Sequence, residues 1–395
     1  MIPESFLSDY EALRSVIARE CKILVSRPIY LFGIIIVPLI CYITFLSLMH
    51  NGLPQKIPTG IVDLDHTASS RNFIRNLNAL DLVDITIQAN SFTEAKKVMQ
   101  KGDIYGFLII PENFEAKAMS GRQPEISYYT NSAYYIPSSL LFKSFKTMSI
   151  LASGKIVMQT KLAKGEYDYQ IMPQLQPINY DVMALGNPWL NYSVYLNNNL
   201  LPGMLQLMVM LMTVFSIGQE VKMRKSRAWI EKANNSIIIA ITGKLLPQTI
   251  LFIFMGIFCQ IIMFGYMHFP HANGFLPMAV AMAMLIVASQ SLGVIIMSIV
   301  PSLRIGLSAA GLIGILSISL AGFTFPTLAM YVPFRLFSEL IPIRHYFLIY
   351  ADQALNGAPL YYSIMQYLYL FLFFAASFPL LKRLKLAMLR QIYVP

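Results

Sequence analysis

Charged side chains are scarce in this chain of 395 residues. Asp, Glu, Lys and Arg make up 13% of it, whereas soluble domains contain about 25%. Five long stretches hold no charged residue at all, and they cover residues 28–55, 182–219, 245–303, 305–334 and 353–381. Because a membrane-spanning helix needs about 20 consecutive apolar residues, these gaps exclude a soluble globular protein and predict a polytopic membrane protein.

Cysteine is also rare, and the polar region 51–197 contains none, so a disulfide within that region is excluded. The spacing of the three cysteines fits no metal site. They are Cys21, Cys41 and Cys259. His268 and His271 lie three apart, but beside a proline in a loop rather than on one helix face. We therefore predict no metal site in this chain.

The sequence lacks a nucleotide-binding loop. Leu245 follows Gly243-Lys244 and Ile156 follows Gly154-Lys155, at positions where a phosphate-binding loop has Ser or Thr. The G-x-S-x-G, H-E-x-x-H and EF-hand patterns are absent as well. We therefore predict no cofactor bound by this chain and no catalytic residue. An intramembrane enzyme is the least supported function, because the spans hold no constellation of acids, bases or metal ligands.

The polar region 51–197 contains 12 of the 20 acids and 13 of the 30 bases, and its length suits an independent domain. Apolar runs predict strands at 57–64, 82–88, 105–110 and about 125–130, and helices at 69–80, 93–101 and 112–119. A long helix follows, with an apolar stripe of Leu141, Phe145, Met148, Ala152 and Ile156. This alternation predicts an α/β domain with a parallel or mixed sheet.

The short run Asp63-Leu64-Asp65 closes the first expected strand. Two carboxylates so close together can bind a cation. We favour a strand end and turn that cap the next helix, since Asp is a preferred capping residue.

Six spans are expected, the first at 29–50 and the others at about 200–219, 245–267, 276–300, 305–325 and 360–381. Fifteen Lys and Arg lie in the segments on the side of the two termini, against only Arg335 and Arg344 in the short loops opposite. By the positive-inside rule, the termini, including the tail 382–395, are cytoplasmic and 51–197 is extracytoplasmic. Because the charges cluster beside spans, the net charge of +10 does not indicate nucleic-acid binding.

The fold class predicted is therefore an α-helical membrane protein with six transmembrane helices, the second to sixth within 198–381, and an inserted α/β extracytoplasmic domain.

Two segments outside the six spans also have distinct patterns. In residues 1–28, apolar residues recur every three or four positions, as in a helix lying in the membrane interface; the alternative is a soluble helix packed on a partner. They are Phe6, Tyr10, Leu13, Ile17, Cys21 and Leu24. The extracytoplasmic segment 326–358 is apolar and rich in proline, which predicts short, half-inserted (re-entrant) helices covered by protein.

The spans contain almost no ionisable residues, so energy for transport is expected to come from outside them. Their polar residues are amides and hydroxyls, and we predict that most form hydrogen bonds between helices. They are Gln206, Gln248, Gln260, Ser289, Gln290, Ser291, Ser308, Ser317 and Ser319. The cytoplasmic loop 220–244 is basic and contains Trp229; it is either a docking helix, since Trp and Arg are favoured at interfaces, or a loop that only fixes topology.

Several local sequences resemble one transporter family. They are Ser26-Arg27-Pro28, the run from Ile61 to Asp65, the run from Gly102 to Phe114, the run from Ala321 to Pro326, the run from Ile341 to Tyr346, and Leu355-Asn356-Gly357. Together they make nearly the whole chain resemble the export-type permeases of ABC transporters, in the class that has a large extracytoplasmic domain between the first two spans.

This resemblance implies that loop 220–244 is a coupling helix that contacts a separate ATPase subunit, and that ATP and magnesium bind in that subunit. The implied contacts are Glu220, Lys222, Arg224, Lys225, Arg227, Trp229 and Glu231. It also implies a second permease copy, identical or related, in contact with membrane lipids of a bacterial inner membrane. The expected cargo is drugs, lipids or other amphipathic solutes, which pass to the outside with or without a periplasmic adaptor protein.

The transport path is expected between the second and fifth spans, and Gln206, Met208, Phe215 and Ser317 are the candidate residues. A second hypothesis is a membrane-anchored sensor or scaffold, whose extracytoplasmic domain binds a ligand or a partner. Six spans and a basic cytoplasmic loop favour the permease, since a scaffold needs only one or two spans.

Overall fold

The computed structural model describes residues 4–50, 52–163, 165, 167, 171, 173, 185–188 and 191–390, with the side chains of residues 4–7 left aside. The chain forms two compact units. One consists of Met1–Gly52 and Ala184–Pro395, and we call it the membrane unit; the other, Leu53–Met183, is the insert. The insert was expected at 51–197. Residues 192–197 belong instead to a helix of the membrane unit, because Asn191 caps that helix through the backbone N–H groups of Ser193 and Val194.

Among the described residues of the membrane unit, six helical segments are long and apolar enough to cross a membrane, as predicted. The first span is Pro28–Leu48, built from α2 (Pro28–Leu31), a π-helical turn η1 (Phe32–Ile36) and α3 (Val37–Leu48). The others are α9 (Tyr192–Lys222), α11 (Ile237–Ile261) with η2 (Ile262–Tyr266), α12 (Phe275–Ile299), α13 (Leu303–Leu320), and α16 (Leu360–Ser377) continued by η5 (Phe378–Leu380) and α17 (Leu381–Arg390).

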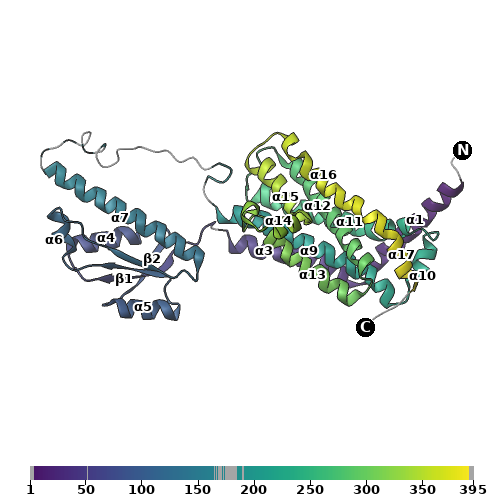
Figure 1. Ribbon diagram of the computed structural model, residues 1–395, viewed down its shortest axis with the longest axis horizontal. Helices are drawn as coiled ribbons and strands as arrows, with labels where there is room; N and C mark the ends of the chain where they lie inside the picture. The colour runs from purple at the N-terminus through teal and green to yellow at the C-terminus, as the bar shows by residue number, and fades with distance from the viewer. Residues whose placement is uncertain are drawn as a thin grey trace. The chain divides into compact units, whose positions relative to one another are not determined.

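Two of these spans form the interior of the membrane unit. Helix α9 packs against α13, α12 and α3, and α12 packs against α9 and α16 (Figure 1). The apolar windows of α9 and α12 are 72% and 67% buried, whereas that of the last span is 17% buried. Most of the hydrophobic surface of the outer spans is therefore left for lipid or for another protein chain.

The N-terminal helix α1 (Glu4–Ser26) packs against α11 of its own chain. Its buried stripe is Ala12, Val16, Glu20 and Leu24, which lies beside the stripe that the sequence predicted. Tyr10 and Cys21 of the predicted stripe are exposed, Leu13 and Ile17 are half-buried, and the Phe6 side chain lies outside the described residues. One face therefore docks on the protein, and the adjacent apolar face stays open to the surroundings.

The segment expected to hold broken helices contains η3 (Thr327–Ala329), α14 (Val332–Glu339), α15 (Pro342–Ile349) and the π-helical turn η4 (Tyr350–Leu355). Helix α15 packs against α16, α12 and α9, and six of its eight residues are buried. In α14, Phe334 and Leu336 are exposed. The surrounding protein therefore covers α15, whereas the apolar side chains of α14 lie at the surface.

The insert has a four-stranded sheet with the order β2-β1-β3-β4, where β1 pairs in parallel with β2 and β3, and β4 is antiparallel to β3. Its strands are β1 (Ile57–Asp63), β2 (Val83–Gln88), β3 (Gly106–Ile110) and β4 (Ser127–Thr130). Its helices are α4 (Ala68–Asn78), α5 (Phe92–Lys101), α6 (Phe114–Met119) and α7 (Tyr135–Ala163). Helices α4, α6 and α7 cover one face and α5 the other (Figure 1). The predicted α/β fold is confirmed.

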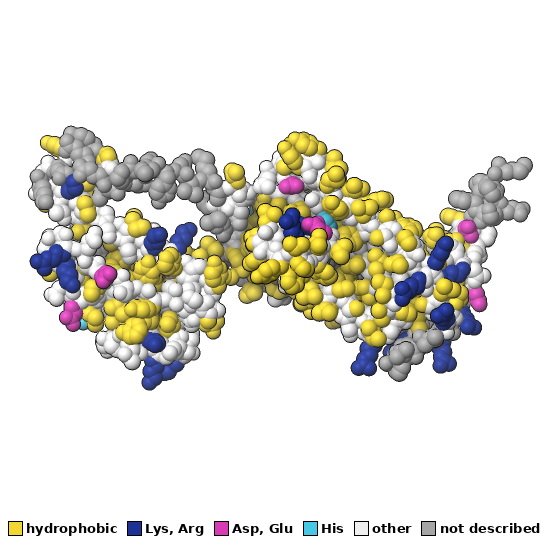
Figure 2. Space-filling view, in the orientation of Figure 1, with side chains coloured by type: hydrophobic (Ala, Val, Ile, Leu, Met, Phe, Trp, Pro, Cys, Tyr) yellow, Lys and Arg dark blue, Asp and Glu magenta, His cyan; other side chains and the backbone are white. Residues whose placement is uncertain are grey.

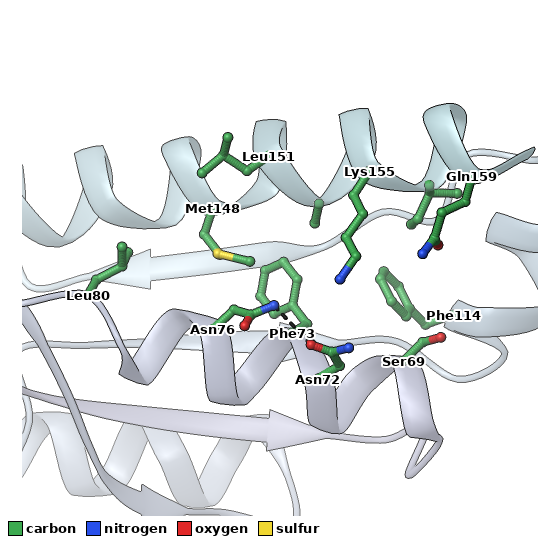
Figure 3. Close-up of a pocket in the computed structure, with 12 residues that line it drawn as sticks. Ser69, Asn72, Phe73, Asn76, Leu80, Phe114, Met148, Leu151, Lys155 and Gln159 are labelled. Atoms are coloured by element: carbon green, nitrogen blue, oxygen red, sulfur yellow. Dashed lines mark hydrogen bonds between the residues drawn. The ribbon is translucent and has the colours of Figure 1, made fainter. Parts of the chain in front are cut away.

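Helix α7 extends past the part of the domain that buries it. Its predicted stripe is buried at Leu141, Phe145 and Met148 but only half-buried at Ala152 and Ile156. The uncovered part forms one wall of a groove of about 320 Å³, and α4 forms the other wall. Figure 3 shows this groove, with the Lys155 side chain reaching from α7 toward α4.

Candidate functional site

Basic side chains gather at the end of the membrane unit that carries α1, α17 and a short helix α10 (Ser226–Lys232), beside the hydrophobic surface of the spans (Figure 2). Helix α10 connects α9 to α11. It is bounded by residues with positive φ, Arg224 before it and Asn234 and Asn235 after it. These turns set α10 apart from the spans, and they place Lys222, Lys225 and Arg227 at the surface.

Helix α10 is held tightly on the end of the bundle. Trp229 and Ile230 are buried, and they belong to a hydrophobic cluster that includes residues of α1, α9, α11 and α17. The Ser226 hydroxyl donates a hydrogen bond to the Met388 carbonyl at 2.8 Å, and Arg227 Nε donates to the Leu389 carbonyl at 3.0 Å. A displacement of α10 therefore cannot occur without disturbing the helices around it.

Beneath α10 lies a network of four charged side chains, which we call the four-charge network: Arg19, Glu20, Glu220 and Lys244. Lys244 Nζ donates to Glu20 Oε2 at 2.8 Å and to Glu220 Oε1 at 2.9 Å. Arg19 donates from Nη2 to both Glu220 oxygens, at 2.8 and 2.9 Å, and from Nη1 to Glu20 Oε1 at 2.7 Å. Three separate elements, α1, α9 and α11, contribute these residues.

The network is neutral and almost dry, since Glu20, Glu220 and Lys244 are each no more than 5% exposed. Two acids and two bases compensate each other, and each carboxylate is bonded to both cations. Removing one partner from a buried ion pair typically costs about 3–5 kcal/mol, because the other charge is left unpaired. The network therefore resists any movement that separates α1, α9 and α11 at this end.

Trp229 extends the network to α10. Its ring centroid lies 5.0 Å from Lys244 Nζ, which is within the range of a cation–π contact. Its indole Nε1 has no hydrogen-bond partner among the described residues. The indole therefore contacts the network through its face and the hydrophobic cluster through its edges, so α10 is joined to the same charges that join the spans.

The charge of Arg19 is secure. Burial disfavours its protonated form, but the hydrogen bond and charge of Glu220, with the charge of Glu20, outweigh that effect and raise the pKa of Arg19 above its usual range. A cation whose pKa is raised by folding contributes its full stabilisation below its unfolded-state pKa and loses it as the pH rises through the folded-state pKa. Arg19 therefore stays protonated throughout the physiological range.

The structure divides the seven expected coupling residues into two groups. Glu220 and Trp229 are buried inside the chain, whereas Lys222, Arg224, Lys225, Arg227 and Glu231 are exposed.

The sequence did not lead to three residues of the network, which are Arg19, Glu20 and Lys244. One signal could have found Lys244, since it is the only Asp, Glu, Lys or Arg between Lys232 and Arg304. A single cation in so apolar a segment requires a buried partner.

The expected path residues lie in closely packed helices. Gln206 and Ser317 are buried, and Met208 and Phe215 are half-buried. The two amide atoms of Gln206 have no partner among the described residues, and the Ser317 hydroxyl bonds to a carbonyl of its own helix. Small residues let α9 and α13 touch: a Cβ on Gly314 would lie 2.4 Å from Leu207 Cδ1. Within one chain, the second and fifth spans leave no gap here.

The polar residues of the spans behave in two ways. Three of the four amides bond between helices, as predicted: Gln248 Nε2 donates to Ser216 Oγ, Gln260 Nε2 to the Tyr346 hydroxyl, and Gln290 Oε1 accepts from Thr249. The fourth, Gln206, has no partner among the described residues. For four serines the prediction was wrong, because each hydroxyl bonds to the carbonyl four residues earlier in its own helix. They are Ser289, Ser291, Ser308 and Ser317. A short hydroxyl reaches its own helix backbone more easily than a neighbouring helix.

Two carboxylates of the insert, those of Asp63 and Asp65, accept hydrogen bonds from backbone N–H groups and from the hydroxyls of Ser70 and Thr67. Asp63 Oδ1 accepts from the N–H groups of Asp65 and His66. Asp65 accepts from the N–H groups of Phe114 at 2.8 Å and Glu115 at 3.1 Å, so it caps α6 rather than the next helix in sequence. In doubly wound sheets, ligands bind beyond the carboxyl ends of the strands at the point where the strand order reverses. Here Asp65 occupies that position, between the ends of β1 and β3.

No group of three His, Cys, Asp or Glu in the described part of the chain is arranged to hold a metal ion. His271, a weak metal candidate from the sequence, has its Nδ1 3.0 Å from the Phe269 carbonyl and its ring beside Phe264. The four-charge network and its basic surface are therefore the best candidate for a functional site. The contacts within it are suited to passing movement from one helix to another.

A comparison with curated proteins gave no match. A comparison with protein families matched residues 28–381 to the family described as ABC-2 family transporter protein. The match runs from the start of the first span to the start of α17 and includes the insert. Membrane subunits of this family are typically non-catalytic and depend on an ATPase partner. The chain is a multi-pass membrane protein that belongs to the ABC-2 family of transporter permeases.

Proposed function

We propose that this chain is the permease subunit of an ATP-binding cassette exporter, and that it dimerises and couples to separate ATPase subunits. One observation carries the proposal: the exposed basic helix α10 is joined through Trp229 and the four-charge network to α1, α9 and α11. A surface helix that is bonded this firmly to two spans is suited to pass a push from a partner into the membrane.

The residues of the coupling segment then have different roles. The exposed Lys222, Arg224, Lys225, Arg227 and Glu231 are the contacts to the ATPase. The buried Glu220 and Trp229 transmit its movement. ATP and magnesium bind in the ATPase subunit, and their binding and release move α10 with the helices beneath it. Because separating the charges of the network is costly, these helices move together.

Movement of the spans opens the transport path. Since α9 and α13 touch within one chain, the path forms either where these helices separate or between two copies of the chain. Gln206, Met208, Phe215 and Ser317 remain the proposed lining. The proposed setting is a bacterial inner membrane with both termini in the cytoplasm, so that the insert is outside. The cargo is amphipathic, such as a drug or lipid, and it passes to the outside with or without a periplasmic adaptor.

The test is to purify the chain with its associated proteins and to reverse three exposed charges, Lys222→Glu, Arg224→Glu and Arg227→Glu. We expect a stoichiometric ATPase with the wild type and its loss with this variant, because a surface that binds a basic helix is complementary to it and therefore repels the reversed charges. The control reverses three exposed lysines of the insert, Lys96→Glu, Lys97→Glu and Lys101→Glu, and should keep the ATPase. Retention of a working ATPase by the α10 variant would contradict the proposed coupling surface.

A further inference from the structure

A second feature lies beside the four-charge network at the same end of the membrane unit. A cavity of about 430 Å³ opens between α1, the start of the first span, the end of α9 and helix α10. Five cationic side chains line it, and Glu220 is its single carboxylate. The cations are Arg19, Lys22, Arg27, Lys225 and Lys232. Such a concentration of positive charge around one cavity calls for an anionic occupant.

The carboxylate does not neutralise the cavity. Glu220 is already bonded to Arg19 and Lys244, so its charge is compensated inside the protein. Within the part of the chain that the structure describes, Lys22, Arg27, Lys225 and Lys232 form no ion pair of their own. Four cations are thus left facing one space, and an anion that entered it would be attracted by all four of them.

The position of the cavity relative to the spans suggests what that anion is. Ser26, Arg27 and Tyr30 line it, and the first span begins at Pro28. The cavity therefore lies at the depth where lipid headgroups meet the hydrocarbon. Helix α1 also keeps Tyr10 and Val25 exposed, as a helix in the membrane interface does. Anionic lipid headgroups carry their phosphate at this depth, and basic pockets there are known to bind them.

We propose that this cavity binds the phosphate of an anionic phospholipid, with Lys22, Arg27 and Lys232 as the main ligands and the acyl chains lying along the first span. The headgroup then contacts both α1 and α10, whose Lys232 and Trp229 belong to one short helix. A bound lipid therefore holds α10 against α1 from the membrane side, just as the four-charge network holds it from within. This proposal needs only a membrane protein and does not depend on the proposed ATPase partner.

The test titrates the purified full-length chain with phosphatidylglycerol and, separately, with phosphatidylcholine of the same acyl chains, and counts bound lipids by native mass spectrometry. We expect one phosphatidylglycerol to bind with a clear preference over phosphatidylcholine. Three neutralising substitutions, Lys22→Gln, Arg27→Gln and Lys232→Gln, should weaken that binding roughly 100-fold, since each basic residue near a headgroup contributes about a fivefold factor.

The matched control removes the same number of charges from exposed residues at the same end of the membrane unit that do not line the cavity, Arg14→Gln, Lys382→Gln and Arg390→Gln. It should keep the preference for phosphatidylglycerol. Equal loss in the two variants would overturn the proposal, because it would show attraction to the surface charge as a whole.

Two further arms separate the possible sources of the anion. Inorganic phosphate, added at the same molar concentration as the lipid, should not displace phosphatidylglycerol. Displacement would overturn the proposal in favour of a soluble anion.

Purified ATPase should bind the cavity variant as it binds the wild type. If the cavity variant keeps the lipid preference but loses the ATPase, the cavity is a protein-docking site and the lipid proposal fails, while the coupling proposal stands.

Discussion

The insert and the membrane unit hold carboxylates that differ in burial and in hydrogen-bond donors: Asp63 and Asp65 are half-buried, whereas Glu20 and Glu220 are buried. In the insert, Asp63 and Asp65 accept hydrogen bonds from backbone N–H groups at turns and at the start of α6. In the membrane unit, Glu20 and Glu220 accept from Arg19 and Lys244. The reason is the backbone, since N–H groups inside a long helix already bond to carbonyls of that helix and only helix starts leave donors free. A carboxylate buried between helices beyond their first turns therefore needs another donor, and in this network the donors are cations.

The sharpest way to break this contrast is to remove the cation that both glutamates share. Lys244→Met leaves Glu20 and Glu220 with Arg19 alone, in a site that is almost closed to water. We expect the free energy of unfolding to fall by about 3–5 kcal/mol, measured as lost thermal stability of the purified chain in detergent. The control Lys382→Met removes an exposed lysine that does not line the cavity and should change stability little.

A double substitution sharpens the same test. Adding Glu20→Gln to Lys244→Met removes the one negative charge that Arg19 leaves uncompensated, so part of the lost stability should return. If Lys244→Met by itself is as stable as the wild type, the four charges do not form the buried network described above.

The insert should respond less to the loss of a carboxylate. Asp65→Ala removes the acceptor for the N–H groups of Phe114 and Glu115, but water can reach the start of α6 once the carboxylate is gone. We expect a loss of about 1–3 kcal/mol and faster hydrogen exchange at these two amides. The substitution Asp103→Ala, at an exposed position, is the control and should leave both amides protected. Unchanged exchange in Asp65→Ala would contradict the capping role.

The sequence predicted the features that depend on apolar periodicity. Charge-free stretches identified six spans, and alternation in 51–197 identified the four strands of the insert, because each residue contributes its hydrophobicity independently of distant partners. The end of the insert was misplaced because Asn187, Asn191 and the residues after them are uncharged, so composition does not mark the start of α9.

The candidate site was only half predictable. The basic loop and Trp229 stood out in the sequence, but their roles did not, because Lys222 and Glu220 are two residues apart in one helix and differ in burial. The network depends on Glu20 meeting Glu220 and Lys244, which are some 200 residues away along the chain. No local pattern encodes such a meeting. A single lysine in an apolar segment showed that a partner was needed, and only the structure showed which one.

The most direct test asks whether α10 and the spans beneath it move as one body. Spin labels are placed on Lys232 of α10 and Ile250 of α11, and separately on Leu312 of α13 in each of two copies, with the native cysteines replaced. When ATP binds to the complex with the ATPase, we predict a changed distance between the two Leu312 labels and a constant distance between Lys232 and Ile250. In Trp229→Leu, we expect the Lys232–Ile250 distance to change and the distance between the two Leu312 labels to stay constant. A changed Lys232–Ile250 distance in the wild type would contradict rigid coupling through Trp229 and the four-charge network.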